Sequence, residues 1–192
     1  MRIGVLALQG SVKEHMDMLD RCGVEAVEVK QPHDMDNIYG LIIPGGESMA
    51  IGKLMKDAGL DKEIRRKYFL GMPIYGTCAG AILLAKEISG SSQLRLGLMD
   101  ISVRRNDYGR QIDSFETELE VDDFDKPFNG VFIRAPIVNA VYNGAKIMSS
   151  FDNKPVLIKQ GNLLISTFHP ELTDDLRIHK YFIDMVKKSV SY

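Results

Sequence analysis

Cysteine is scarce in this sequence, which has 192 residues but only Cys22 and Cys78. Two cysteines cannot build the disulfide framework of a small secreted domain, so we expect a reducing, cytoplasmic setting. The first residues lead straight into an apolar run and lack the h-region and cleavage site of a signal peptide. No apolar run is long enough to span a bilayer. These absences argue against a secreted or membrane-embedded protein.

An excess of charge of one sign is also absent, because 24 lysines and arginines nearly balance 26 aspartates and glutamates, for a formal net charge of -2. We therefore expect neither nucleic acid nor an anionic membrane as a partner. No internal repeat, low-complexity tract or clear linker interrupts the chain, so a single domain over residues 1–192 is expected. A Walker loop, a metal-ligand cluster and an obvious Schiff-base lysine are missing too, so no metal or cofactor is expected.

Apolar runs alternate with helical patterns in the first half of the sequence. The order strand–helix–strand–strand–helix–helix–strand–helix predicts a parallel sheet with helices on both faces. Ser11 and Glu14 have the spacing of a capping box at the start of the first helix. The expected strands are RIGVLAL, VEAVEVK, YGLIIPGG and MPIYGTC, and the later helices are SMAIGKLMKDAG, DKEIRRKYFLG and AGAILLAKEI.

Closely spaced strand-like segments fill the second half: LMDISVRRN, SFETELEV, GVFIRAPIV, AKIMSS, KPVLIKQ and NLLISTF. Such spacing predicts antiparallel hairpins that extend or flank the sheet. The segment LTDDLRIHKYFIDMVKKSV is expected to be an amphipathic helix, with apolar surface from Leu176, Tyr181, Ile183 and Met185. The predicted fold is α/β and three-layered, with a mainly parallel central sheet, helices on both faces and antiparallel strands in the second half.

Cys78 lies in PIYGTCAGAI, where an apolar strand is expected to turn into a helix. Gly76 and Gly80 flank it in the nucleophile-elbow pattern G-x-Nuc-x-G, in which glycine lets the backbone turn sharply. A helix N-terminus favours the thiolate, and the N–H of Ala79 can face an oxyanion. The alternative is a buried cysteine at a crowded strand–helix junction, and we expect such a packing role for Cys22.

A thiol nucleophile needs a base, and the base needs a group that orients it. His169 ends an apolar strand in ISTFHPEL, and Pro170 favours extended geometry before it. Residues i and i+2 of an extended segment share a face, so Glu171 can fix the tautomer of the imidazole. The alternative is a turn after the strand, with Glu171 capping the last helix. The other histidines are expected to be structural or at the surface: His15, His33 and His179.

A third segment, LIIPGGES, runs from an apolar strand into Gly45 and Gly46, where the backbone can approach a ligand closely. The N–H of Gly46 is a candidate second oxyanion donor. The alternative is a plain strand–helix turn with Glu47 or Ser48 at the helix cap.

The motifs PGG, G-x-C-x-G and H-P-E, in this order along the chain, resemble the class I glutamine amidotransferases, which implies their flavodoxin-like fold. Longer segments are similar, nearly from end to end, to the glutaminase subunit of pyridoxal 5'-phosphate synthase. The LQG and N-x-x-G-R-Q-x-D-S-F-E segments are specific to that family. One departure is Met49-Ala50, where the family often has threonine, and we expect it to change helix packing rather than chemistry. The similar segments are IGVLALQGSVKEH, LIIPGGES, GTCAGAILLAKEI, RRNDYGRQIDSFE, GVFIRAPI and STFHPELTDD.

The resemblance implies that the chain hydrolyses L-glutamine to L-glutamate and ammonia. Cys78 would attack the side-chain amide, His169 would shuttle protons and Glu171 would orient His169. N–H groups near Gly46 and Ala79 would hold the oxyanion. The glutamine contacts of the family fall on Gly46, Glu47, Ser48, Arg105, Ile133 and Arg134.

The resemblance also implies a partner, because ammonia released into water at neutral pH becomes mostly ammonium, which is not a nucleophile. That partner is a (β/α)8-barrel subunit that makes pyridoxal 5'-phosphate in a hetero-oligomeric complex. Gln9 and Gly10 follow the first strand and would touch it. No cofactor is implied for this chain itself.

Three other interpretations stay open from the sequence. The chain could be another amidotransferase subunit of the same fold, such as the one serving imidazole glycerol phosphate synthesis. It could be a stand-alone cysteine hydrolase or peptidase. It could also be a non-enzymatic protein in which Cys78 is a packing residue or a redox sensor, although this leaves His169 and Glu171 unexplained.

Overall fold

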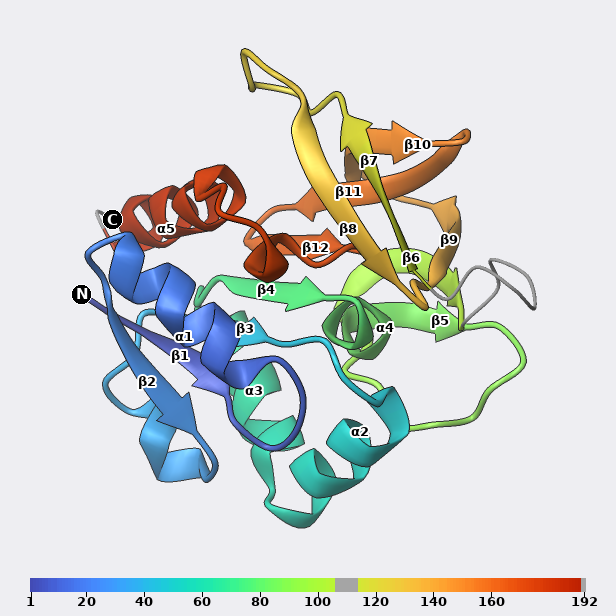
Figure 1. The fold of residues 1–192 in the computed structure, drawn as a ribbon. Helices are drawn as coiled ribbons and strands as arrows, with labels where there is room; N and C mark the ends of the chain where they lie inside the picture. Colours follow the sequence, from blue (N-terminus) through green and yellow to red (C-terminus); the bar gives the residue numbers. More distant parts are fainter. Residues whose placement is uncertain (106–113, 191–192) are drawn as a thin grey trace.

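The computed structural model describes residues 1–105 and 114–190, and Figure 1 shows how they are arranged. A seven-stranded sheet runs through the centre, with the strand order β10-β11-β12-β4-β3-β1-β2. The strands from β12 to β2 pair in parallel, and β11 and β10 extend the sheet in antiparallel fashion. The bounds are β1 (Arg2–Leu6), β2 (Glu25–Val29), β3 (Gly40–Ile43), β4 (Ile74–Thr77), β10 (Lys146–Phe151), β11 (Lys154–Gln160) and β12 (Leu163–Ser166).

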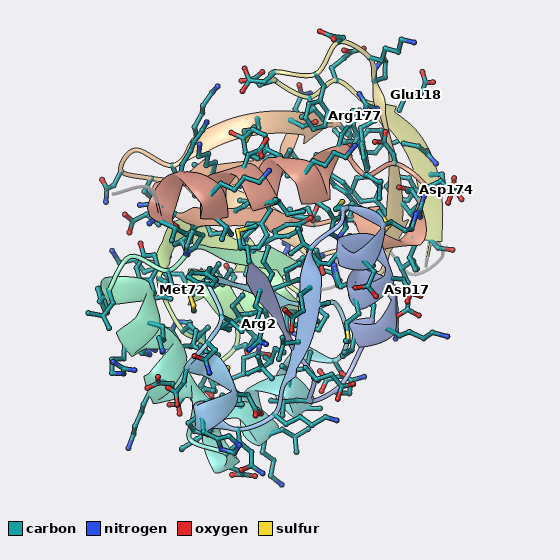
Figure 2. All side chains as sticks on the ribbon, turned by 90° about the vertical axis from the view of Figure 1, so that its left-hand side faces the viewer. Arg2, Asp17, Met72, Glu118, Asp174 and Arg177 are labelled. Atoms are coloured by element: carbon teal, nitrogen blue, oxygen red, sulfur yellow. The ribbon has the colours of Figure 1, made fainter. Side chains whose placement is uncertain are left out.

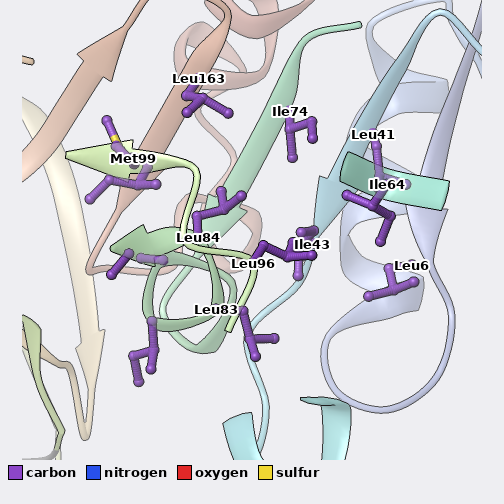
Figure 3. Packing of buried hydrophobic residues seen from close by; sticks show 14 of the residues in the cluster. Leu6, Leu41, Ile43, Ile64, Ile74, Leu83, Leu84, Leu96, Met99 and Leu163 are labelled. Atoms are coloured by element: carbon purple, nitrogen blue, oxygen red, sulfur yellow. The ribbon is translucent and has the colours of Figure 1, made fainter. Parts of the chain in front are cut away.

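Both faces of the sheet are buried, because the side chains of one strand alternate between two apolar clusters. In β3, Leu41 and Ile43 belong to one cluster and Ile42 belongs to the other. Strands with two buried faces are nearly continuous apolar runs, and β1, β3 and β4 have this pattern in the sequence. Figure 3 shows part of the first cluster, where Leu84 lies among residues of the sheet that include Ile74.

Two outer layers cover these faces (Figure 1). The layer over the first cluster consists of α2 (Ser48–Asp57), α3 (Leu60–Phe69), α4 (Ala79–Leu84) and a small sheet of β5 (Ala85–Ile88), β6 (Met99–Arg104) and β9 (Ile137–Val141). The layer over the second cluster consists of α1 (Val12–Arg21), α5 (Arg177–Val190) and the hairpin of β7 (Ser114–Leu119) and β8 (Phe128–Ile133). Short 3-10 helices are η1 (Pro32–Met35) and η2 (Pro170–Leu172). The predicted three-layer α/β fold, with antiparallel strands in the second half, is confirmed.

The predicted bounds of two elements are wrong. The helix expected from AGAILLAKEI ends at Leu84, and Ala85–Ile88 forms strand β5, which pairs in parallel with β6. Pairing with β6 overrides the helix propensity of Ala, Lys and Glu in this segment. The single strand expected from GVFIRAPIV is divided into β8 and β9, because Arg134 has a φ of 41° and interrupts the extended backbone.

The starts of two helices also differ from the sequence prediction. Ser11 does precede α1, but its side chain makes no capping bond, and its hydroxyl donates instead to Oε1 of Glu171. The last helix begins at Arg177, so Glu171 lies in η2 and does not cap it. Among the described residues, no helix is long and apolar enough to cross a membrane.

Candidate active site

A cavity of about 270 Å³ opens at the carboxyl edge of the parallel strands. Ligands of open α/β sheets bind at this edge, because loops from neighbouring strands converge there. Of the residues predicted for the site, Gly10, Ala79 and Glu171 lie outside the cavity wall. The wall is formed by Gln9, Gly46, Glu47, Ser48, Cys78, Ile82, Arg105, Ile133, Arg134 and His169.

Cys78 occupies a sharp turn between β4 and α4. Its φ of 47° and ψ of -100° lie outside the regions that non-glycine residues prefer, as expected of a nucleophile elbow. The turn presses α4 against β3, so that a Cβ on Gly80 would lie 2.1 Å from the carbonyl oxygen of Ile43. Only glycine fits there. Cys78 is buried, with 7% of the residue exposed. It is the N-cap residue of α4, and although its side chain makes no capping hydrogen bond, the helix dipole at this end favours a thiolate.

His169 follows β12, the strand next to β4. Its backbone N–H donates to the carbonyl of Val131 at 2.8 Å, which fixes the segment. Nδ1 lies 2.8 Å from Oε1 of Glu171. Because an ionised carboxylate only accepts hydrogen bonds, Nδ1 carries the proton and Nε2 is left for the thiol of Cys78.

The charges of His169 and Glu171 depend strongly on each other. Burial alone lowers the pKa of His169, but hydrogen bonds to Cys78 and Glu171 outweigh burial and raise the pKa to about 10. Burial raises the pKa of Glu171, but His15 and His169 outweigh it and hold the pKa well below its usual value. A protonated imidazole beside an ionised carboxylate is therefore the state that this geometry favours.

The Gly45–Gly46 turn lies directly against the LQG turn. The N–H of Ser11 donates to the carbonyl of Gly45 at 3.0 Å, and the N–H of Glu47 donates to Oε1 of Gln9 at 2.8 Å. A Cβ on Gly10 would lie 1.8 Å from the carbonyl oxygen of Gly45, so the two turns pack backbone against backbone. The orientation of the Gly45–Gly46 peptide is thus tied to the turn that follows β1.

Glu47 has two structural roles at the mouth of the cavity. It is the N-cap of α2, where it accepts bonds from the N–H groups of Met49 and Ala50 at 3.1 and 2.8 Å. Oε1 also pairs with Nη2 of Arg105 at 3.0 Å. The interpretation of LIIPGGES as a capped strand–helix turn is therefore right for Glu47. Met49, which follows Ser48 in α2, is 52% exposed.

Arg105 is held by a second contact, in which Nη1 donates to Oε1 of Gln93 at 3.1 Å. Gln93 in turn donates to the hydroxyl of Ser48 at 3.1 Å. Gln93 was not predicted from the sequence, because no local pattern links it to Ser48 or Arg105. The motif N-x-x-G-R-Q-x-D, which begins beside Arg105, falls on residues 106–113 and lies outside the described residues.

Ile133 and Arg134 close the cavity at the end of β8. Sγ of Cys78 lies 3.9 Å from the carbonyl oxygen of Ile133. Arg134 was expected within the strand GVFIRAPIV, but it follows β8, has a φ of 41° and is exposed at the cavity wall.

Behind Glu171, further from the cavity, lies a group of polar residues that the sequence analysis placed elsewhere. Ser11 donates to Oε1 of Glu171 at 2.6 Å, and Nε2 of His15 lies 3.5 Å from the same oxygen. Residues four apart share a helix face, so the spacing of Ser11 and His15 was the one available signal that they act together. No cluster of side chains within the described parts of the chain could hold a metal ion.

The fold and the cysteine elbow together define a protein of the glutamine amidotransferase class. A crystal structure of a glutamine amidotransferase superposes with a TM-score of 0.93 at 46% sequence identity, covering 96% of this chain and 98% of that one. A glutamine amidotransferase from Thermotoga maritima shares the fold, with a TM-score of 0.61 at 16% identity over 98% of this chain and 84% of that one.

Sequence comparison shows to which family of glutamine amidotransferases the chain belongs. The chain belongs to the SNO glutamine amidotransferase family, whose model matches residues 5–188. It is 50% identical over 191 residues to the pyridoxal 5'-phosphate synthase subunit PdxT of Carboxydothermus hydrogenoformans, covering 99% of this chain and 100% of that protein. It is 49% identical over 188 residues to the PdxT subunit of Thermotoga maritima, covering 97% of this chain and 100% of that protein.

Proposed function

We propose that this chain is a single glutaminase domain over residues 1–192, which hydrolyses L-glutamine to L-glutamate and ammonia. The observation that carries the proposal is the strained elbow at Cys78 beside the His169–Glu171 pair, whose Nδ1 and Oε1 atoms are 2.8 Å apart. A nucleophile, a base and an orienting carboxylate are the three groups that acyl transfer through a thiol requires.

The reaction begins with an ion pair of a Cys78 thiolate and a protonated His169. The thiolate attacks the side-chain amide carbon, and the N–H groups of Ala79 and Gly46 hold the oxyanion that forms. His169 then protonates the leaving nitrogen, so that ammonia departs and a γ-glutamyl thioester remains. A water molecule gives its proton to His169 and attacks the thioester, which releases glutamate and restores the ion pair of the Cys78 thiolate and protonated His169.

Glutamine binds in the cavity with its amide at Cys78 and its charged end towards the mouth. The proposed contacts are Gly46, Glu47, Ser48, Arg105, Ile133 and Arg134, and all of them line the cavity. Glu47 can accept from the α-ammonium group, and the arginines can donate to the α-carboxylate. The Glu47–Arg105 ion pair at 3.0 Å lets these opposite charges lie side by side, as they do in a zwitterionic amino acid.

The ammonia is used by another polypeptide. The relatives at about 50% identity are named as subunits of pyridoxal 5'-phosphate synthase, which supports the same assignment here. The partner is a (β/α)8-barrel synthase subunit in a cytoplasmic hetero-oligomeric complex, and Gln9 and Gly10 contact it. This chain requires no cofactor or metal of its own.

The two cysteines provide a matched test of this proposal. Cys78→Ala should abolish glutamine hydrolysis in the presence of the synthase while the protein stays folded, because the thiol is needed only for the covalent step. Cys22→Ala should retain the activity, since Cys22 packs at the end of α1. Glutamate release and thermal melting would be measured for both variants. Activity in a folded Cys78→Ala variant would refute the assignment of the nucleophile.

A further inference from the structure

Glu171 is held by more groups than a catalytic triad needs. Every polar contact of its carboxylate within the described residues is made by one atom, Oε1, which lies 2.8 Å from Nδ1 of His169, 2.6 Å from Oγ of Ser11 and 3.5 Å from Nε2 of His15. A rotation of the carboxylate would break these contacts together. These contacts therefore fix the orientation of the Glu171 carboxylate and also favour its ionised form.

His15 is the centre of this buried group. Its Nε2 lies 3.1 Å from Oγ1 of Thr77, the residue before Cys78, and its Nδ1 lies 3.0 Å from Nε2 of His179. Both histidines have 0% exposure. The rings come from α1 and α5, which lie side by side over the sheet in Figure 2. Two buried imidazoles on different helices thus connect α5 to the carboxylate and to the nucleophile's strand.

The charge of Glu171 decides where the protons of both rings lie. An ionised carboxylate repels a bare nitrogen, so Nε2 of His15 carries a proton, which is shared between Thr77 and the more distant Oε1. In the tautomer with its hydrogen on Nε2, Nδ1 of His15 is an acceptor and takes the proton of Nε2 of His179. Nδ1 of His179 has no partner among the described residues, and in this assignment it carries no hydrogen. The network therefore leaves no buried ring N–H without a partner.

We propose that His15, held by His179, is a positioning residue for glutamine hydrolysis: it keeps the Glu171 carboxylate ionised and aligned with Nδ1 of His169. The two histidines touch no substrate and act through Glu171. In a site of low dielectric, a donor near the carboxylate has a larger effect than it would in water. An aligned Glu171 in turn holds His169 in the tautomer that presents Nε2 to Cys78. This inference rests on the proposed glutaminase function.

Other ionisable groups face the network and set its charge balance. The ring of Tyr75, from β4, lies edge-on to both histidines at centroid distances of 6.3 and 6.2 Å, and its hydroxyl bonds to Ser166 at 2.9 Å. Arg21, at the end of α1, pairs with Asp174 at 3.2 Å. Since Arg21 is already paired and partly exposed, the uncompensated negative charge nearest to His15 is that of Glu171.

His15→Leu and His15→Gln test the proposal as a pair. Leucine removes both ring nitrogens, so kcat with synthase present should fall by about tenfold or more, a part of the 10²–10⁴-fold that acid–base catalysis contributes. The KM for glutamine should stay within about twofold, because His15 is outside the cavity. Glutamine keeps an amide N–H near the position of Nε2 and should restore most of kcat. His33→Gln, on the exposed helix η1, is the control and should match the wild type.

A second measurement needs neither glutamine nor the synthase. The rate at which iodoacetamide alkylates Cys78 would be followed against pH in Cys22→Ala backgrounds. Weaker support from Glu171 should destabilise protonated His169, so the part of the profile that reports this proton should move to lower pH in His15→Leu. If wild type lacked glutaminase activity, the proposed function would fail, while this profile would still test the positioning role.

His179→Phe serves if His15→Leu does not fold, because His179 does not touch Glu171. It should give the same pattern to a smaller degree: lower kcat, nearly constant KM and a shifted alkylation profile. The proposal is overturned if folded His15→Leu or His179→Phe has wild-type kcat and an unshifted profile. It is also overturned if His15→Gln is as impaired as His15→Leu, because the network would then serve packing alone.

Discussion

His179 is a histidine that its surroundings keep uncharged. Burial, with a further contribution from His15, lowers its pKa from 6.5 to about 3. The unfolded chain therefore binds a proton that the folded chain does not bind between these two values. Its contribution to stability is complete above pH 6.5 and is lost progressively as the pH falls towards 3.

This pKa shift predicts an acid-sensitive contribution to stability, which is read from the difference in slope between wild type and His179→Phe, because His169, whose pKa is raised to about 10, contributes in the opposite direction in both proteins. Between pH 7 and pH 5, the free energy of unfolding should decrease with a slope of at most about 1.4 kcal/mol per pH unit from this one group. His179→Phe should be less stable at pH 7 but should show a shallower slope. Urea unfolding at several pH values would measure this slope for wild type and for His179→Phe.

His33→Gln controls for the loss of a histidine, because His33 is exposed, and it should keep the wild-type slope. The window stops at pH 5 so that Glu171, whose folded pKa is lowered, does not contribute. An equal slope in wild type and His179→Phe would show that another group causes the acid sensitivity.

The residues that the sequence could predict are those joined by short spacings. G-x-C-x-G and H-P-E each place their functional groups within two positions, so backbone geometry alone relates them. His15, His179 and Gln93 meet the site only through contacts between distant elements. Ser11 was misassigned because S-x-x-E is a real local capping pattern, yet the hydroxyl found a buried carboxylate, which is the stronger acceptor.

Among the elements, the contact between α4 and β3 is a close backbone approach on which the site depends. Gly80→Ala would place a methyl group 2.1 Å from a backbone carbonyl oxygen that cannot move without disturbing β3. We expect a loss of about 1–3 kcal/mol in unfolding free energy, the usual cost of overpacking, together with lower glutaminase activity because the elbow moves. Urea unfolding and glutamate release would test both effects.

Gly52→Ala in α2 is the matched control for this change. Its added methyl would meet its nearest atoms at 3.4 Å, an ordinary contact, and alanine is the better helix former. This variant should be as stable as the wild type or more stable, and it should remain active. If Gly80→Ala behaved in the same way, the close approach of α4 and β3 would not constrain the elbow.

Element boundaries were predicted less well than element types, for a physical reason. The segment Ala85–Ile88 contains good helix formers, and only its pairing with β6 makes it a strand. Likewise, nothing local in FIRAP indicates that Arg134 turns the chain between β8 and β9. Periodicity carries information about burial, whereas these boundaries depend on strand pairing and on a backbone turn that the local pattern does not indicate.

At the scale of the whole molecule, the fold follows from the apolar runs. Strands that are buried on both sides need helices on both faces, and the chain supplies them in alternation. The pattern of apolar runs could not predict the strand order, because it does not show which distant segments pair with each other. NLLISTF was expected in a hairpin, and β12 does pair with β11 in antiparallel fashion, but it also pairs with β4 in parallel.

The assembled complex should be the active form of the enzyme. The peptide between Gly45 and Gly46 is held by the N–H of Ser11, in the turn that we propose as the partner contact. A partner that binds this turn can change the position of the Gly46 N–H by favouring one arrangement of the loop. We therefore expect low glutamate release from the isolated chain and at least about tenfold more with synthase, which corresponds to a shift of about 1.4 kcal/mol.

Gln9→Ala should weaken this activation, because it removes the bond between Gln9 and the N–H of Glu47. Alkylation of Cys78 by iodoacetamide should be unchanged, since Gln9 does not support the elbow. His33→Gln is again the control. Full activity of the isolated wild-type chain, with no increase on adding synthase, would contradict the prediction.

β12 lies in the interior of the sheet, although its residues come late in the sequence. It lies between β4 and β11, and Leu163–Ser166 is the last strand of the described residues. During translation, β4 therefore remains an open edge and Cys78 has no His169 beside it until most of the polypeptide has left the ribosome. A nascent or truncated chain that ends before Glu171 cannot assemble the site, so ammonia is released only by molecules that contain both halves of it.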